Sequence, residues 1–160
     1  MIPDDLMAEY RRRYRTIYDR ADLYVPFMER CLSNLVPDGV LGFICSDRWM
    51  KNRYGKKLRQ FVSHAYSLTH YVDMVDTQAF HADVSAYPAI TVIRRGSEKP
   101  TRVAFRPEVS RSSLSSLAAA MTCSGLPPAD TGVRELSWVV RGQEPWVLHA
   151  SEDLALVRRL

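Results

Sequence analysis

The chain has 160 residues, of which 46% are hydrophobic and 10% aromatic, and a formal net charge of +4 at pH 7. These values are typical of one globular domain, or of one domain plus part of a second, and they exclude a disordered chain. No apolar run approaches the ~20 residues that a membrane helix needs, and the N-terminus lacks the regions of a secretory signal. The 3 widely spaced cysteines indicate free thiols. We therefore expect a cytoplasmic protein with no membrane partner.

The first part of the chain has the pattern of two helices. Residues 4–20 are rich in helix formers, and Asp4 or Asp5 is the expected N-cap. A second amphipathic helix is predicted over residues 22–35, because its apolar residues recur at three- and four-residue spacing. Asp22 is the expected N-cap of this second helix.

A buried strand is predicted next, over Val40–Ser46, after the turn Val36–Gly39. The strand is apolar on both faces, and strands of this kind are usually covered by helices on both sides. A helix, a tight turn and a buried strand make one unit of an open α/β sheet. Ligands of such sheets bind outside the carboxyl ends of the strands, which here is the start of residues 48–59.

The rest of the chain predicts two more helices, four more strands and a domain boundary. Helices are expected over residues 54–65 and 112–121, and strands over residues 68–75, 88–94, 101–105 and 136–140. The Pro- and Gly-containing stretch 122–132 has the composition of a linker. We therefore predict one domain over residues 1–121 and the start of a second over residues 133–160.

Positive charge is concentrated in two clusters. The first is formed by four arginines within residues 11–15, and the second, residues 48–59, contains six cations and no acid: Arg48, Lys51, Arg53, Lys56, Lys57 and Arg59. Tyrosine and tryptophan side chains are interleaved with both clusters. Solvated surfaces would explain either cluster alone, but the two together favour a phosphate backbone as partner.

Familiar catalytic motifs are absent from the sequence. It contains no Gly-x-Gly-x-x-Gly, no phosphate-binding loop and no Gly-x-Ser-x-Gly. His64, His70 and His81 lack the spacing of metal ligands, so no metal site is predicted. Asp73 and Asp76 are better explained as a solvated strand end than as a carboxylate pair.

Three segments of the chain nevertheless resemble a known family. They are Ala21-Asp22-Leu23-Tyr24 with Phe27 and Glu29, then Gly39-Val40-Leu41-Gly42-Phe43-Ile44, then Tyr54-Gly55-Lys56-Lys57-Leu58-Arg59. In this order they resemble the middle of the N6-adenine DNA methyltransferases of restriction–modification systems, and the large fused restriction–methylase enzymes (type IIG) in particular. The resemblance covers about residues 10–120.

The resemblance implies an α/β fold that is part of a Rossmann-like S-adenosylmethionine-dependent methyltransferase sheet. Residues 40–46, 68–75 and 88–94 would be its last three strands, with the final strand antiparallel. The family's glycine-rich cofactor turn and its catalytic Asn-Pro-Pro-Tyr are both missing here, since neither Asn34 nor Asn52 precedes a proline. The chain thus resembles the C-terminal half of a catalytic domain, inactive alone, whose N-terminal half would come from elsewhere, for instance from a second chain.

The resemblance also implies roles for particular residues. Phe80, in the loop before the last strand, would stack on an adenine flipped out of duplex DNA. Asp22, Leu23 and Tyr24 would line the S-adenosylmethionine pocket, although helix capping explains Asp22 almost as well. Contacts with DNA phosphates are expected from the basic segment: Arg48, Lys51, Arg53, Lys56 and Lys57.

Two other interpretations are open at this point. The chain could be a nucleic-acid-binding remnant, or half of a split enzyme, with no activity of its own. It could also be part of an RNA or protein methyltransferase, because sites of the Asn-Pro-Pro-Tyr type serve those substrates as well.

Overall fold

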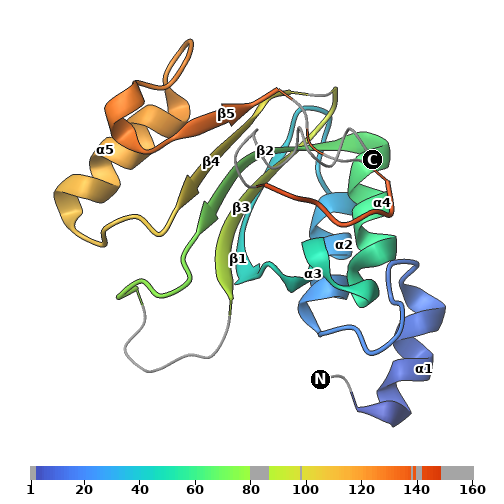
Figure 1. Cartoon of the computed structure of the whole chain (residues 1–160). Coiled ribbons are helices and arrows are strands. Elements are labelled where there is room, and N and C mark those ends of the chain that lie inside the picture. The colour runs from blue at the N-terminus through green and yellow to red at the C-terminus, as the bar shows by residue number, and fades with distance from the viewer. Residues whose placement is uncertain (1–2, 80–86, 98, 138, 140–141, 149–160) are drawn as a thin grey trace, which may run out of the picture.

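The computed structural model describes residues 3–79, 87–97, 99–137, 139 and 142–148. These residues form one mixed sheet with helices on both faces (Figure 1). Helices α2 and α4 lie on one side of the sheet, and α5 lies on the other. Within the described parts of the chain, no helix is long and apolar enough to span a bilayer.

The sheet has the strand order β1-β3-β2-β4-β5 over the described residues. Its strands are β1 (Val40–Ser46), β2 (Tyr66–Asp73), β3 (Pro88–Arg95), β4 (Thr101–Phe105) and β5 (Arg134–Leu136). Strand β3 lies between β1 and β2 and is antiparallel to both, whereas β2 and β4 are parallel. The predicted antiparallel last strand is therefore confirmed, and it is inserted between the other two. The strand predicted over residues 136–140 is instead β5, which ends at Leu136 and pairs with β4.

The first two helices are shorter than the sequence pattern predicts, whereas α5 extends one residue beyond its predicted range at each end. They are α1 (Asp4–Arg13), α2 (Tyr24–Ser33), α3 (Arg48–Lys51), η1 (Arg53–Gly55), α4 (Lys56–Ala65), α5 (Arg111–Thr122) and η2 (Ala129–Thr131). The predicted caps are wrong. Pro3 holds the N-cap position of α1, and Leu23 that of α2, where Asp22 was expected.

Strand β1 has one covered face and one open face. Leu41, Phe43 and Cys45 pack against the main core, whereas Val40 and Ile44 are 54% and 55% exposed. The prediction of helices on both sides of this strand is therefore wrong. In the described sheet β1 pairs with β3 alone, so its second edge presents unpaired backbone groups to which another strand can add.

Residues 142–148 cross back over α3 and α4. The Gly142 amide donates to Ser63 Oγ (2.8 Å), and the Trp146 amide donates to the Met50 carbonyl (2.9 Å). The Trp146 ring packs edge-on against Trp49, with 5.3 Å between the ring centroids, and both side chains are buried. Part of residues 133–160 thus packs in the main core. The division of the chain into two domains stays a prediction.

Candidate functional site

The carboxyl end of β1 is held by a buried carboxylate. Asp47, 3% exposed, accepts hydrogen bonds from Lys51 Nζ (2.7 Å) and from the Tyr71 hydroxyl (3.0 Å). Burial raises the pKa of Tyr71, and the nearby charge of Asp47 raises it further, so this hydroxyl remains a donor. Lys51, a predicted phosphate contact, therefore has its ammonium engaged with Asp47.

Both ends of the loop that contains Phe80 are fixed at this point. The Asp47 amide donates to the Tyr87 carbonyl (2.9 Å), and the Met74 amide donates to the Pro88 carbonyl (2.9 Å). The guanidinium of Arg48, another predicted phosphate contact, lies 4.7 Å from the centroid of the Tyr87 ring. Phe80 itself lies outside the described residues.

A second polar cluster joins the start of α2 to η1, and it contains two of the predicted cofactor residues. The hydroxyls of Tyr24 and Tyr54 are 2.6 Å apart, and the Tyr54 hydroxyl donates to Asp22 Oδ2 at 3.5 Å. Burial first, and then the hydrogen bond with Tyr54, raise the pKa of Tyr24. Leu23, the third predicted residue, exposes 44% of its surface beside this cluster.

The segment between α1 and α2 is held by a buried acid. Glu29, 7% exposed, accepts hydrogen bonds from the Thr16 amide (2.9 Å) and the Thr16 hydroxyl (2.6 Å). Arg15 adds an ion pair at 3.7 Å. These contacts explain why the helix predicted to reach Arg20 ends at Arg13, because residues 15–16 turn away to satisfy Glu29.

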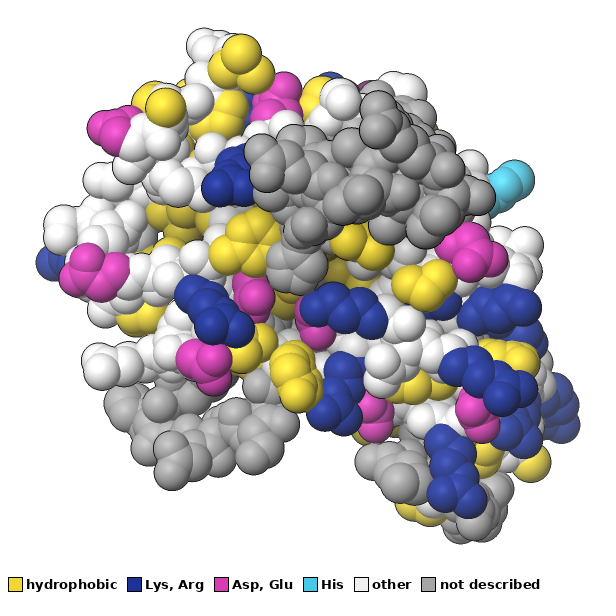
Figure 2. Space-filling model, in the orientation of Figure 1, with side chains coloured by type: hydrophobic (Ala, Val, Ile, Leu, Met, Phe, Trp, Pro, Cys, Tyr) yellow, Lys and Arg dark blue, Asp and Glu magenta, His cyan; other side chains and the backbone are white. Residues whose placement is uncertain are grey.

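The second basic cluster contacts Tyr18, which lies three residues after the first cluster. Arg53 Nη2 lies 3.5 Å from the Tyr18 hydroxyl, and Lys57 Nζ lies 5.7 Å from the centroid of the Tyr18 ring. In Figure 2, Lys and Arg side chains gather in the lower right of the view, where Figure 1 places α1. Lys56, the first residue of α4 and the neighbour of Lys57, is also exposed.

Arg59, in contrast, belongs to the core. It is 2% exposed, and its guanidinium donates to the carbonyls of Trp49 (2.7 Å), Asn52 (2.8 Å) and Gln143 (2.7 Å). Counting it among the surface cations of residues 48–59 was therefore wrong. Its partners come from two segments that are distant in sequence, residues 49–52 and residue 143, and no sequence spacing indicates that they meet.

Cys45 lies half-buried in β1, two residues before Asp47, and its environment predicts an unreactive thiol. Burial, with a smaller effect of the Asp47 charge, raises the pKa of Cys45 to about 12 from a usual value of 9.0. Because only the thiolate is nucleophilic, we expect iodoacetamide at pH 8 to alkylate folded Cys45 about a thousandfold more slowly than an unperturbed thiol. Peptide mapping by mass spectrometry measures this rate, and the same reaction in urea is the control. Equal rates in the folded and unfolded protein would contradict the expectation.

Comparison with known sequences places the chain among methyltransferases. The model of the Eco57I restriction-modification methylase family matches residues 2–80. The chain is 58% identical over 164 residues to the type II methyltransferase M.XhoI of Xanthomonas vasicola, and 55% identical over 160 residues to the type II methyltransferase M.PaeR7I of Pseudomonas aeruginosa. Both alignments cover 100% of this chain, and they cover 30% and 28% of the two relatives. The similarity therefore continues beyond residues 10–120.

A fused enzyme matches a shorter part of the chain. The type II restriction enzyme and methyltransferase RM.Eco57I of Escherichia coli is 37% identical over 71 residues, which is 44% of this chain and 7% of that enzyme. Among solved structures, the type IIG restriction endonuclease BpuSI superposes with a TM-score of 0.63 at 14% identity, covering 86% of this chain and 18% of its own. A likeness at this identity concerns the fold alone.

The fold is thus part of a restriction–modification methyltransferase fold. By sequence, the chain belongs with the type II restriction–modification methyltransferases. It spans less than a third of the length of the curated relatives that match all of it.

Proposed function

We propose that this chain is the C-terminal half of the catalytic domain of an S-adenosylmethionine-dependent DNA methyltransferase that methylates adenine N6 in duplex DNA. The observation that carries the proposal is the strand order β1-β3-β2 with β3 antiparallel, in a chain 43–58% identical over its whole length to type II methyltransferases. DNA as substrate is consistent with the cations around Tyr18, and it implies a cytoplasmic location.

The residues at the start of α2 fit a nucleoside-type cofactor. The Asp22 carboxylate can accept hydrogen bonds from hydroxyl or amino groups, and the exposed Leu23 side chain offers apolar surface to a flat ring. Tyr24 holds Tyr54, which in turn positions Asp22. When bound, S-adenosylmethionine supplies the methyl group.

The target base would be bound at the carboxyl end of β1. In this proposal the base is flipped out of the duplex, since its amino group cannot be reached inside the stack. Phe80 stacks on it, which is worth ~1–3 kcal/mol. The Asp47 amide, which donates to the Tyr87 carbonyl, fixes one described end of the loop that contains Phe80.

The reacting amino group would be gripped by residues from outside this chain, since the sequence contains no Asn-Pro-Pro motif. We propose that a polypeptide supplying the N-terminal half of the domain adds its strands at the open edge of β1. The chain alone is then inactive.

The test is a methyl-transfer assay with labelled S-adenosylmethionine and duplex DNA. The chain is assayed alone and with the part of M.PaeR7I that precedes the aligned region, and digested DNA is analysed by mass spectrometry. We expect N6-methyladenine only when both polypeptides are present. The amount should be much lower when the chain carries Phe80→Ala. Transfer by the isolated chain would refute its inactivity, and methylcytosine, methylated RNA or methylated protein as the product would refute the proposed substrate.

A further inference from the structure

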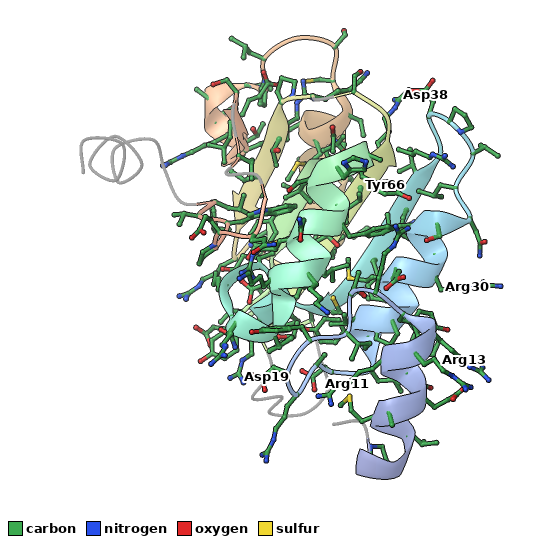
Figure 3. The ribbon with its side chains drawn as sticks, turned by 90° about the vertical axis from the view of Figure 1, so that its right-hand side faces the viewer. Arg11, Arg13, Asp19, Arg30, Asp38 and Tyr66 are labelled. Atoms are coloured by element: carbon green, nitrogen blue, oxygen red, sulfur yellow. The ribbon has the colours of Figure 1, made fainter. Side chains whose placement is uncertain are left out.

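Tyr18 contacts two cations of η1 and α4, and Arg11 of α1 contacts the backbone of the next residue. Its ring centroid lies 6.0 Å from the Arg53 guanidinium and 5.7 Å from Lys57 Nζ. Lys57 also reaches the Ile17 carbonyl (3.5 Å), and Arg11 reaches the Asp19 carbonyl (3.2 Å). We call Arg11, Tyr18, Arg53, Lys56 and Lys57 the Tyr18 surface. Figure 3 places Arg11 and Asp19 near each other at one end of the molecule, with Asp38 at the other.

The neighbouring arginines of the first cluster are neutralised by acids. Arg12 and Arg13 pair with Glu9 at 2.6 and 2.5 Å, and Arg15 pairs with Glu29 at 3.7 Å. The cations of the Tyr18 surface instead meet a ring, a hydroxyl or backbone carbonyls. Asp19 is the acid near this surface, and its negative charge acts to raise the pKa of both Tyr18 and Arg53. Positive charge therefore exceeds negative charge here.

The Tyr18 hydroxyl is a hydrogen-bond donor within this positive field. The hydrogen bond from Arg53, and then the Arg53 charge, lower the pKa of Tyr18, which is the effect expected where an anion is favoured. An Arg and a Tyr hydroxyl side by side offer several donors to the oxygens of one phosphate. The four cations of the surface are exposed and Tyr18 is half-buried, so a long polyanion can reach them.

The position of this surface connects it to the candidate site. Arg53 and Tyr54 are adjacent in η1, and Tyr54 belongs to the Asp22 cluster, so the two sites share one short element. We infer that the Tyr18 surface binds the phosphate backbone of the DNA duplex beside the methylated base. This inference rests on the proposed function for its substrate. It adds Tyr18 and Arg11 to the contacts expected from sequence.

Salt dependence of binding tests the inference. Binding of the chain to a fluorescent duplex is measured between roughly 50 and 300 mM KCl, where the logarithm of the binding constant falls linearly with the logarithm of the salt concentration. The slope is compared between the parent chain and the double variant Arg53→Ala/Lys57→Ala. Each lost phosphate contact lowers the slope by about 0.9, so the double variant should lose about 1.8. The loss should be the same on a duplex of scrambled sequence, because phosphate contacts carry no sequence information.

The matched control is Lys99→Ala/Arg134→Ala, which also removes two exposed positive charges but from the loop before β4 and from β5. Its slope should equal that of the parent. Tyr18→Phe keeps the ring and removes one donor, so it should weaken binding about threefold to tenfold and leave the slope unchanged. If Arg53→Ala/Lys57→Ala and its control change the slope equally, or if Tyr18→Phe binds like the parent, the inference is wrong.

The outcome also separates this inference from the proposed function. A parent chain that binds no duplex at 50 mM KCl would count against DNA as the substrate altogether. A parent chain that binds, with Arg53→Ala/Lys57→Ala keeping the full slope, would refute the Tyr18 surface alone. Melting curves of each variant confirm that the fold is intact, and Tyr18→Phe decides the question if the double variant melts early.

Discussion

Replacing Gly55 by alanine is expected to lower the free energy of unfolding by about 3 kcal/mol or more. The reason is close approach and not backbone conformation. A Cβ at Gly55 would lie 1.8 Å from the Trp49 carbonyl oxygen and 2.5 Å from its carbon. Both are backbone atoms, so no side chain can rotate away. Either η1 or α3 must move, and the Arg59 hydrogen bond to the same carbonyl is strained with it.

Urea denaturation followed by tryptophan fluorescence measures this loss. Gly42→Ala is the matched control, because a Cβ at Gly42 meets no atom within 4 Å. It should change the unfolding free energy by no more than about 0.5 kcal/mol. A Gly55→Ala protein that unfolds within about 1 kcal/mol of the parent would show that α3 and η1 adjust freely.

Replacing Arg59 by methionine should cost about 3–5 kcal/mol. The substitution removes the donor of the buried Trp49 carbonyl and one donor each from the partly buried carbonyls of Asn52 and Gln143. Arg59→Lys should recover only part of this loss, since a lysine ammonium cannot reproduce the planar fork that reaches three carbonyls at once. Burial lowers the pKa of Arg59, but the guanidinium still remains charged at neutral pH.

Lys56→Met is the control, because it removes an exposed cation from the same helix. It should leave the unfolding free energy within about 0.5 kcal/mol of the parent. The double variant Gly55→Ala/Arg59→Met should lose less than the sum of the two single losses, because both act on the Trp49 carbonyl. Strict additivity in this cycle would mean that the two residues act independently.

These residues explain the motif Tyr-Gly-x-x-Leu-Arg at residues 54–59. Tyr54 hydrogen-bonds with Tyr24, Gly55 admits the Trp49 carbonyl, Leu58 is fully buried, and Arg59 ties two segments that are distant in sequence together. From the sequence alone the same stretch was interpreted as a cationic surface. That interpretation suits Lys56 and Lys57, which are exposed, and fails for Arg59.

Local patterns predicted the elements whose boundaries are set locally. The bounds of β1 match the prediction, because Pro37–Gly39 turns the chain before it and the polar pair Asp47–Arg48 follows it. The same holds for β4, whose predicted range is the observed one. The early end of α1 and the short helix α3 depend on Glu29 and Asp47, which find their partners through tertiary contacts.

The candidate site was only partly predictable for the same reason. Asp22 and Tyr24 were named from the family resemblance, and the structure brings them together with Tyr54. Asp47, Tyr71 and Tyr18 were missed, although Tyr18 could have been noticed as an aromatic residue just after the first basic cluster. The roles of Phe80 and of the predicted phosphate contacts stay predictions.

The central place of β3 in the sheet has a consequence for the order of folding. The pairing of β1 is with Pro88–Arg94, so this pairing cannot form until the chain has been made through β3. Synthesis at ~5–20 residues per second leaves this edge of the apolar strand unpaired for seconds on the ribosome. During that interval α2 and α4 are the described elements that can shield its inner face. Nascent chains that stall before β3 should therefore be the ones that chaperones bind.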